Sequence, residues 1–185
     1  MRSALLFLLL LLVAVAAYLA FAPKRAVLPP AGTYGPFDFT LVSTEGETVS
    51  LDDFAGQVVI VDVWGTWCTP CRMGIPHFVE LQDEYREEGL RIVGINYEMG
   101  TPDEALAAIE KFTSEVPVNY PLLIGDDATG AQIPGFGTFP NVLFIDRQGK
   151  IRHTLVGLHS KEELEAVAKP LLEEASQPTQ PLPQS

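Results

Sequence analysis

The sequence predicts an α/β fold with a central mixed β-sheet flanked by helices, and two observations carry this prediction. Two runs of mainly aliphatic and β-branched residues, 58–64 and 90–96, are typical of strands buried on both faces. Between them, residues 69–88 carry apolar side chains at helical spacing and end before Gly89. The order strand, helix, strand predicts a parallel pair with a right-handed crossover.

Local patterns predict the other elements of the domain. Alternating apolar and polar residues at 37–41 and 48–51 indicate an N-terminal β-hairpin extension. Thr101 is expected to cap a helix that begins at Pro102 and ends near Ser114. The remaining predictions are a strand at 121–124, a glycine-rich loop or site rim at 125–138, a hairpin of 141–145 and 151–156, and a helix at 162–174 with a capping box of Ser160 and Glu163.

Size and charge limit the classes of function. The 185 residues support one domain with accessory segments, and 12 Lys+Arg against 24 Asp+Glu give a net charge of -12. Nucleic-acid binding is excluded because it needs clustered basic residues. The two cysteines are too few for a disulfide framework or a four-cysteine metal site, so they are expected to act as a pair.

The N-terminus is expected to form a transmembrane signal anchor. Residues 3–22 carry no charge, and 19 of these 20 are apolar, which is about enough to cross a ~30 Å hydrocarbon layer. A cleaved signal peptide is the alternative, since small-x-small patterns occur in this segment. The predicted organisation is an anchor at 1–22, a Pro-rich linker at 23–35, the globular domain at 36–175 and a disordered tail at 176–185.

Cys68 and Cys71 form a Cys-x-x-Cys pair where the first central strand gives way to the helix. At the helix N-terminus, unpaired N–H groups and the helix dipole favour the thiolate of Cys68, which makes it a nucleophile. Cys71 lies one turn later on the same face and can resolve a mixed disulfide. A zinc site is the alternative, but no histidine has an accepted ligand spacing to the pair, so no metal is expected.

The run from Val61 to Cys71, VDVWGTWCTPC, resembles the thioredoxin superfamily. Together with the N-terminal hairpin, the WGTWC segment is similar to the membrane-anchored TlpA/ResA-like branch, which includes thiol reductases of cytochrome c maturation. The resemblance covers residues 36–172 and implies a thioredoxin-like fold. It also implies a thiol-disulfide oxidoreductase that uses a redox-active Cys68–Cys71 disulfide and no other cofactor.

The resemblance assigns catalytic roles residue by residue. Cys68 is the attacking cysteine, Cys71 the resolving cysteine, and Asp62 the buried acid that relays the proton of the resolving thiol. A carboxyl group buried in an apolar strand should have a raised pKa, which suits general acid/base work near neutral pH. A structural acid paired with a lysine is the alternative reading of Asp62.

Five residues are expected to contact substrate. Trp67 shields the thiol and offers an apolar contact, while Thr69 and Pro70 lie between the cysteines. Phe139-Pro140 matches the cis-proline of the superfamily, so the backbone of Phe139 is expected to pair with a substrate strand.

The chain departs from the TlpA/ResA-like branch in its carboxylates. Gly74 stands where the branch usually has a glutamate, three residues after the second cysteine. Asp62 stands where many members have a neutral residue. The arrangement is therefore nearer that of thioredoxins in general.

The expected function is that of an extracytoplasmic thiol-disulfide oxidoreductase. It would be membrane-anchored with its catalytic domain on the periplasmic side. It would act as a reductase, and cytochrome c maturation is one process in which it could take part. A membrane thiol-disulfide protein would supply electrons, and protein disulfides would receive them. The alternatives are a membrane-anchored metal chaperone and a peroxiredoxin-like peroxidase; the latter is disfavoured because Thr66 precedes Cys68 by two residues instead of three.

Overall fold

The computed structural model describes residue 34 and residues 37–174. The predicted anchor at 1–22 and the predicted tail lie outside the described residues, as does the linker except for Tyr34. Tyr34 is partly buried against the domain, and its hydroxyl lies 3.1 Å from Thr154 Oγ1. Within this described part of the chain, none of the helices has the length and hydropathy needed to cross a bilayer.

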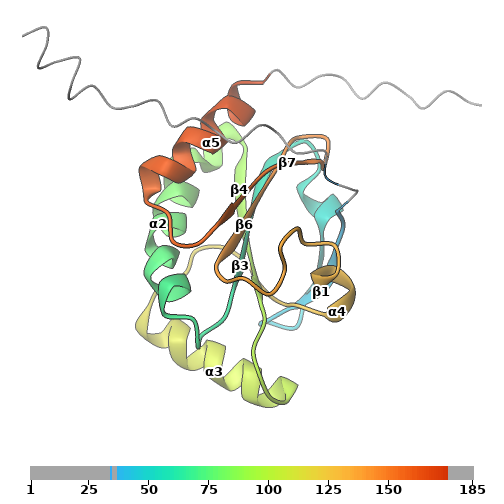
Figure 1. The fold of residues 1–185 in the computed structure, drawn as a ribbon, viewed down its shortest axis with the longest axis vertical. Helices are drawn as coiled ribbons and strands as arrows, with labels where there is room; N and C mark the ends of the chain where they lie inside the picture. Colours follow the sequence, from blue (N-terminus) through green and yellow to red (C-terminus); the bar gives the residue numbers. More distant parts are fainter. Residues whose placement is uncertain (1–33, 35–36, 175–185) are drawn as a thin grey trace, which may run out of the picture.

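One mixed β-sheet forms the centre of the domain (Figure 1). In the described residues it has seven strands in the order β2-β1-β5-β4-β3-β6-β7. Strands β3, β4 and β5 are parallel to one another, whereas the hairpins β1–β2 and β6–β7 add antiparallel strands at the two sides. The bounds are β1 Thr40–Ser43, β2 Thr48–Ser50, β3 Val58–Trp64, β4 Leu90–Asn96, β5 Leu122–Ile124, β6 Asn141–Ile145 and β7 Ile151–Val156.

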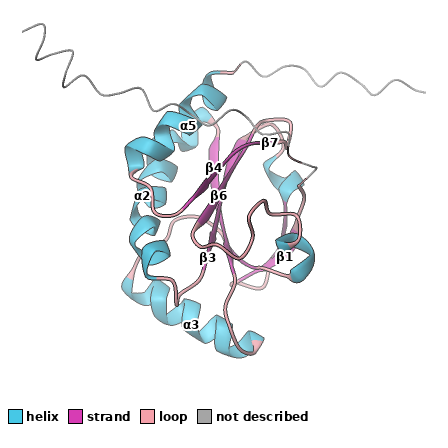
Figure 2. Cartoon of the chain, in the orientation of Figure 1, coloured by secondary structure: helices cyan, strands magenta, loops and turns pink. Residues whose placement is uncertain are grey.

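Helices cover both faces of the sheet unequally (Figure 2). The long helices α2 (Thr69–Tyr85), α3 (Pro102–Glu115) and α5 (Lys161–Glu173) pack on one face. The short helices η1 (Leu51–Phe54) and α4 (Asp127–Gly130) lie on the other face, which the residues before β1 also cover. The predicted α/β class, mixed sheet and N-terminal hairpin are therefore confirmed.

Strand β3 is the central element and positions the acid of the sequence motif. It pairs in parallel with β4 and antiparallel with β6, and all of its residues are buried. Side chains alternate between the two faces of a strand. Ile60 and Trp64 pack in the core beneath α2 and α5, while Val61 and Val63 pack in the opposite core. Asp62 therefore points to the face that carries α2.

The predicted helix at 69–88 proves to be two segments. The α-helix α2 ends at Tyr85 and continues as the 3-10 turn η2 (Arg86–Glu88). Gly89 follows with φ of 92°, a left-handed conformation that glycine adopts without a steric penalty. Pro76 lies inside α2.

The two predicted N-caps, Thr101 and Ser160, begin the other long helices, and both form capping boxes, of which only that of Ser160 was predicted. The Thr101 hydroxyl accepts a hydrogen bond from the N–H of Glu104 at the start of α3. The Ser160 hydroxyl likewise accepts a hydrogen bond from the N–H of Glu163 at the start of α5. In each box the glutamate carboxylate accepts a hydrogen bond from the backbone N–H of the capping residue. Helix α3 therefore starts at the predicted Pro102, and α5 starts at Lys161, one residue before the predicted start.

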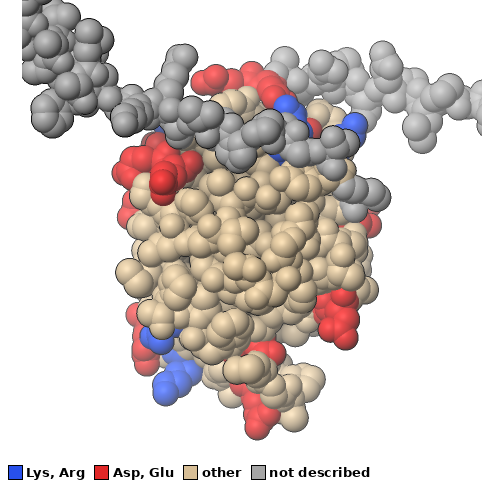
Figure 3. Space-filling model, in the orientation of Figure 1, with Lys and Arg blue, Asp and Glu red and all other residues tan. Residues whose placement is uncertain are grey.

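Charged side chains lie mainly at the margins of the face in Figure 3, whose centre is uncharged. Arg152 contacts Glu174 at 2.8 Å and Asp146 at 3.2 Å, and Lys161 pairs with Glu84. Asp146 is buried, but the Arg152–Glu174 and Lys161–Glu84 pairs lie at the surface, where an ion pair contributes only about 0–1 kcal/mol. The fold therefore depends mainly on the apolar cores on either side of the sheet.

Candidate active site

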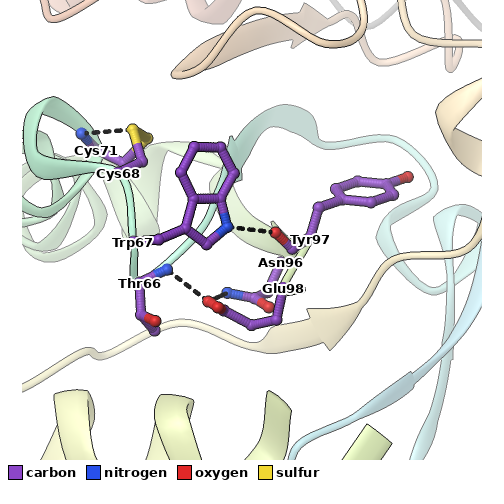
Figure 4. Close-up of a disulfide and its surroundings, with 7 residues drawn as sticks. All are labelled: Thr66, Trp67, Cys68, Cys71, Asn96, Tyr97 and Glu98. Carbon is purple, nitrogen blue, oxygen red and sulfur yellow. Dashed lines mark hydrogen bonds between the residues drawn. A yellow bond between two sulfur atoms is a disulfide. The ribbon is translucent and has the colours of Figure 1, made fainter. Parts of the chain in front are cut away.

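Cys68 and Cys71 form a disulfide at the start of α2, with a Cα–Cα distance of 5.3 Å. Cys68 is the N-cap of the helix, and its Sγ accepts a hydrogen bond from the Cys71 N–H at 3.3 Å (Figure 4). The same N–H would face a thiolate after reduction, and the dipole of a helix favours negative charge at this end. The predicted junction of strand, cysteine pair and helix is therefore present.

The two sulfur-bearing residues are both largely buried, but not equally. Cys68 is 5% exposed and Cys71 is 1% exposed, so Cys68 is nearer to solvent. The intervening Thr69 and Pro70 form the exposed first turn of α2. An incoming sulfur would thus meet the side of the disulfide formed by Cys68 and the turn that follows it.

Trp67 is held beside the disulfide by a hydrogen bond. Its indole Nε1–H donates to the carbonyl oxygen of Tyr97 at 2.9 Å, while 46% of the residue remains exposed (Figure 4). The N–H of Tyr97 in turn donates to the carbonyl of Trp64 at 2.9 Å. These bonds join the loop before the cysteines to the end of β4 and fix the orientation of the indole ring.

Glu98 makes a second connection between the same segments. Its carboxylate accepts hydrogen bonds from the backbone N–H of Thr66 and from the side-chain amide of Asn96, the latter at 3.1 Å (Figure 4). The sequence reasoning did not find Glu98. The only signal was its place directly after a central strand, at the edge of the sheet where the carboxyl ends of parallel strands meet.

Four aromatic rings form a continuous surface next to the cysteine pair. The Phe139 ring lies 5.1 Å from Trp67 and 6.0 Å from Phe136, and Tyr97 lies 4.7 Å from Phe136. Phe136 is 43% exposed, so this surface is accessible. Trp67 and Phe139 were predicted to contact substrate, whereas Tyr97 and Phe136 were not identified.

The predicted Phe139–Pro140 peptide bond is cis. Pro140 is buried and lines one small cavity together with Cys71. Phe139 precedes Asn141, the first paired residue of β6, so its backbone lies outside the sheet ladder. The two residues predicted from the Phe-Pro motif thus lie beside the disulfide.

Asp62 is 1% exposed, and neither of its carboxylate oxygens has a hydrogen-bond partner in the described residues. Burial away from water raises the pKa of this carboxyl from 3.8 to about 8, because desolvation disfavours the charged form. No Lys or Arg of the described chain pairs with it. The alternative of a structural acid paired with lysine is therefore wrong, since the facing strand offers Gly94 at the paired position.

Gly74 is buried in α2 beside the loop after β7. A Cβ atom at this position would lie 3.4 Å from Leu158 Cδ1. Leu158 therefore covers the place from which a glutamate side chain would project in the TlpA/ResA-like branch.

The described residues hold no group of three or more His, Cys, Asp or Glu side chains that could bind a metal ion. The cysteines are bonded to each other and so are not available as ligands in this state. The expectation that the protein uses no metal and no separate cofactor stays a prediction.

A family profile and several known proteins match this chain. The AhpC/TSA family profile matches residues 35–154. A thiol-disulfide oxidoreductase ResA from Bacillus thuringiensis (strain Al Hakam) is 30% identical over 132 residues, which are 71% of this chain and 73% of the relative. The ResA of Geobacillus kaustophilus is 29% identical over 165 residues, 89% of this chain and 91% of the relative.

Solved structures show the same fold. A crystal structure described as a thiol:disulfide interchange protein DsbE from Chlorobium tepidum matches with a TM-score of 0.66 and 30% identity, covering 78% of this chain and 99% of that one. A secreted thiol-disulfide isomerase from Corynebacterium glutamicum matches with a TM-score of 0.65 and 27% identity, covering 75% and 86%. The fold is therefore thioredoxin-like.

Proposed function

The chain belongs to the AhpC/TSA family and is a thiol-disulfide oxidoreductase of the ResA/DsbE type, and we propose that it reduces protein disulfides on the extracytoplasmic side of a membrane. The observation that carries this proposal is the Cys68–Cys71 disulfide at the N-terminus of α2, with the unpartnered Asp62 buried in the adjoining strand. A thiol at a helix N-terminus is favoured as a thiolate and so can act as the nucleophile, and a buried carboxyl group near it can accept a proton during the exchange.

The reaction has two exchange steps. In the reduced enzyme, the Cys68 thiolate attacks a sulfur of the substrate disulfide; a mixed disulfide forms, and the other substrate sulfur leaves as a thiolate that takes a proton from water. The Cys71 thiol then gives its proton to the Asp62 carboxylate and attacks Cys68 Sγ, which releases the second substrate sulfur as a thiolate. The substrate gains two electrons, and the enzyme returns to the disulfide form with Asp62 protonated.

The aromatic surface supports substrates that are polypeptides. Trp67 presents an exposed ring and Phe139 a partly buried one in contact with it, and the Phe139 backbone lies outside the sheet ladder. An extended substrate segment could therefore bury an apolar side chain on these rings and pair with this backbone. Thr69 and Pro70 would contact the residues next to the substrate cysteine.

The proposed location rests on the sequence before the domain. Residues 3–22 are uncharged and apolar, which supports an N-terminal anchor with the catalytic domain on the periplasmic side. A membrane thiol-disulfide protein would then re-reduce the Cys68–Cys71 disulfide. Cytochrome c maturation is the narrower setting that the resemblance implies. Fractionation of cells that express the full chain would test the location, and a domain recovered in the soluble cytoplasmic fraction would contradict it.

Two cysteine variants test the enzyme activity. Cys68→Ser should abolish the reduction of insulin disulfides, whereas Cys71→Ser should accumulate mixed disulfides with substrate proteins, because the resolving thiol is missing. Full activity of Cys68→Ser would contradict the mechanism. Rapid consumption of hydrogen peroxide without insulin reduction would favour the peroxidase alternative, and tight stoichiometric binding of copper or zinc to the reduced protein would favour the metal chaperone.

The reduction potential of the Cys68/Cys71 couple tests the proposed direction. A value near that of thioredoxin, about -270 mV, would support a reductase. A value near that of DsbA, about -120 mV, would identify an oxidant and would overturn this part of the proposal.

A further inference from the structure

Among the buried polar groups that lack hydrogen-bond partners in the described part of the chain, three belong to residues that lie around Gly94 on the α2 face of the sheet. They are the Asp62 carboxyl, the indole Nε1–H of Trp64 and the hydroxyl of Tyr120. An unsatisfied buried donor or acceptor costs about 1–3 kcal/mol, so such groups are uncommon without a reason. The Oδ1 atom of Asn96, which pairs with Trp64 in the sheet, is a further unpartnered acceptor on the same face in the described residues.

The groups converge on one glycine. Gly94 in β4 pairs with Asp62 in β3, and paired residues of adjacent strands point to the same face. A Cβ atom at Gly94 would lie 3.1 Å from Trp64 Nε1 and 3.3 Å from Tyr120 Cε2. Together with Leu122, whose Cδ2 would lie 2.6 Å from that Cβ atom, the two aromatic side chains occupy the space that a side chain opposite Asp62 would otherwise fill.

In the part of the chain that the structure describes, no Lys, Arg or His forms an ion pair with Asp62. Strand β6 places Val142 beside it, and β4 places Gly94. Among the buried residues of this core, the other titratable side chains are Cys68, Cys71, Tyr85 and Tyr120. The Tyr85 hydroxyl is already bonded to Glu165 at 2.9 Å, while burial and then the charge of Asp62 raise the pKa of Tyr120. Tyr120 thus stays protonated and remains a donor.

We propose that the Tyr120 hydroxyl and the Trp64 indole N–H stabilise the ionised carboxylate of Asp62 in the reduced enzyme, as two neutral donors that take the place of a cation. This inference rests on the proposed function, in which Asp62 accepts the proton of Cys71. Tyr120 and Trp64 are positioning residues in this scheme, because they act on the proton acceptor and do not touch the reacting sulfurs.

The arrangement has a chemical consequence for each half of the cycle. In the oxidised enzyme Asp62 is protonated, so the two donors do not lie beside a negative charge. When the enzyme is reduced, Asp62 must ionise before it can accept the Cys71 proton, and hydrogen bonds to an ionised acceptor are about twice as strong as neutral ones. The two donors would therefore stabilise the state in which Asp62 is a base.

The Asp62 carboxyl carbon can be followed directly by NMR. Reduced protein labelled with ¹³C-aspartate would be titrated as the wild type, as Tyr120→Phe and as Tyr85→Phe. Tyr120→Phe should raise the Asp62 midpoint by about one pH unit, a tenfold change in the proton equilibrium. Tyr85→Phe removes a hydroxyl from the same core and should leave the midpoint in place. An unchanged midpoint in Tyr120→Phe, or an equal shift in Tyr85→Phe, would overturn the proposal.

A measurement on the unmodified chain keeps the proposal testable if Tyr120→Phe does not fold. The chain has two tryptophans, and their indole N–H signals can be followed in the same titration. The Trp64 signal should shift with the Asp62 midpoint, whereas the Trp67 signal should not, because its N–H is bonded to Tyr97. A Trp64 signal that is insensitive to this titration would count against the role of its indole N–H.

The pH profile of insulin reduction distinguishes a failure of the proposed proton relay from a failure of this inference about its two donors. Asp62→Asn should remove the contribution of the Asp62 carboxyl from the pH profile of insulin reduction. Adding Tyr120→Phe to the Asp62→Asn variant should then cause no further change in that profile. If Asp62→Asn leaves the profile unchanged, the proton-relay role of Asp62 fails. The NMR titration would still decide whether the two donors stabilise its carboxylate.

Discussion

Replacing Asp62 with asparagine should change how the stability of the oxidised protein depends on pH. Burial raises the pKa of Asp62 from 3.8 to about 8 in the folded protein. Between these values the folded state keeps a proton that the unfolded state has lost. The unfolded state therefore binds fewer protons, and the free energy of unfolding falls as pH rises through this window.

The expected size follows from the proton difference of one group. One proton corresponds to a slope of about 1.4 kcal/mol per pH unit, so Asp62 should lower the free energy of unfolding by about 2.7 kcal/mol between pH 5 and pH 7. Asparagine does not titrate and lacks this contribution. The difference in stability between wild type and Asp62→Asn should therefore change by that amount, whatever constant cost the buried amide adds.

Urea denaturation at pH 5, 6 and 7, followed by circular dichroism, would measure this difference. Glu110→Gln is a matched control, because it makes the same change from carboxyl to amide at an exposed position of α3 without an ion pair in the described chain. Its stability curve should run parallel to that of the wild type. A constant difference between wild type and Asp62→Asn from pH 5 to pH 7 would show that Asp62 ionises normally and would refute the reasoning.

Three further substitutions test contacts around the site and the fold. Glu98→Ala leaves the N–H of Thr66 without its acceptor and should lower the free energy of unfolding by about 1–2 kcal/mol, measured by urea denaturation. It should also lower insulin reductase activity. An unchanged urea midpoint would contradict this expectation. Gly94→Ala places a Cβ atom 2.6 Å from Leu122 Cδ2 and should cost about 1–3 kcal/mol, seen as a lower Tm. Ser160→Ala removes a helix cap and should cost about 1 kcal/mol, whereas Ser160→Thr should retain most of the stability.

The sequence predicted best those elements that carry a long, continuous pattern of apolar residues. Strands β3 and β4 have the predicted bounds, because buried parallel strands consist of almost continuous aliphatic residues. The strand predicted at 37–41 begins at Thr40, because its partner reaches only to Ser50, and it extends to Ser43, because β5 pairs with its end. Helix α4 was missed because four residues within a glycine-rich segment show no helical periodicity.

The cysteine pair and the acid of the site could be found from spacing, but their surroundings could not. The absence of a cation beside Asp62 depends on Gly94, which strand pairing brings opposite to it from 32 residues along the chain. Tyr120 reaches this place from the segment before β5, which has no motif. Glu98 likewise contacts Thr66 only because β3 and β4 are in parallel register.

The edges of the sheet bear on how this protein can handle unfolded chains. An exposed sheet edge can pair with an extended polypeptide and so start aggregation. Strand β2, at one edge, has only three residues, and β7, at the other, carries Arg152, which is held by Asp146 and Glu174. Both features make edge pairing unfavourable. An oxidoreductase that contacts protein disulfides therefore has sheet edges at which pairing with another polypeptide is disfavoured.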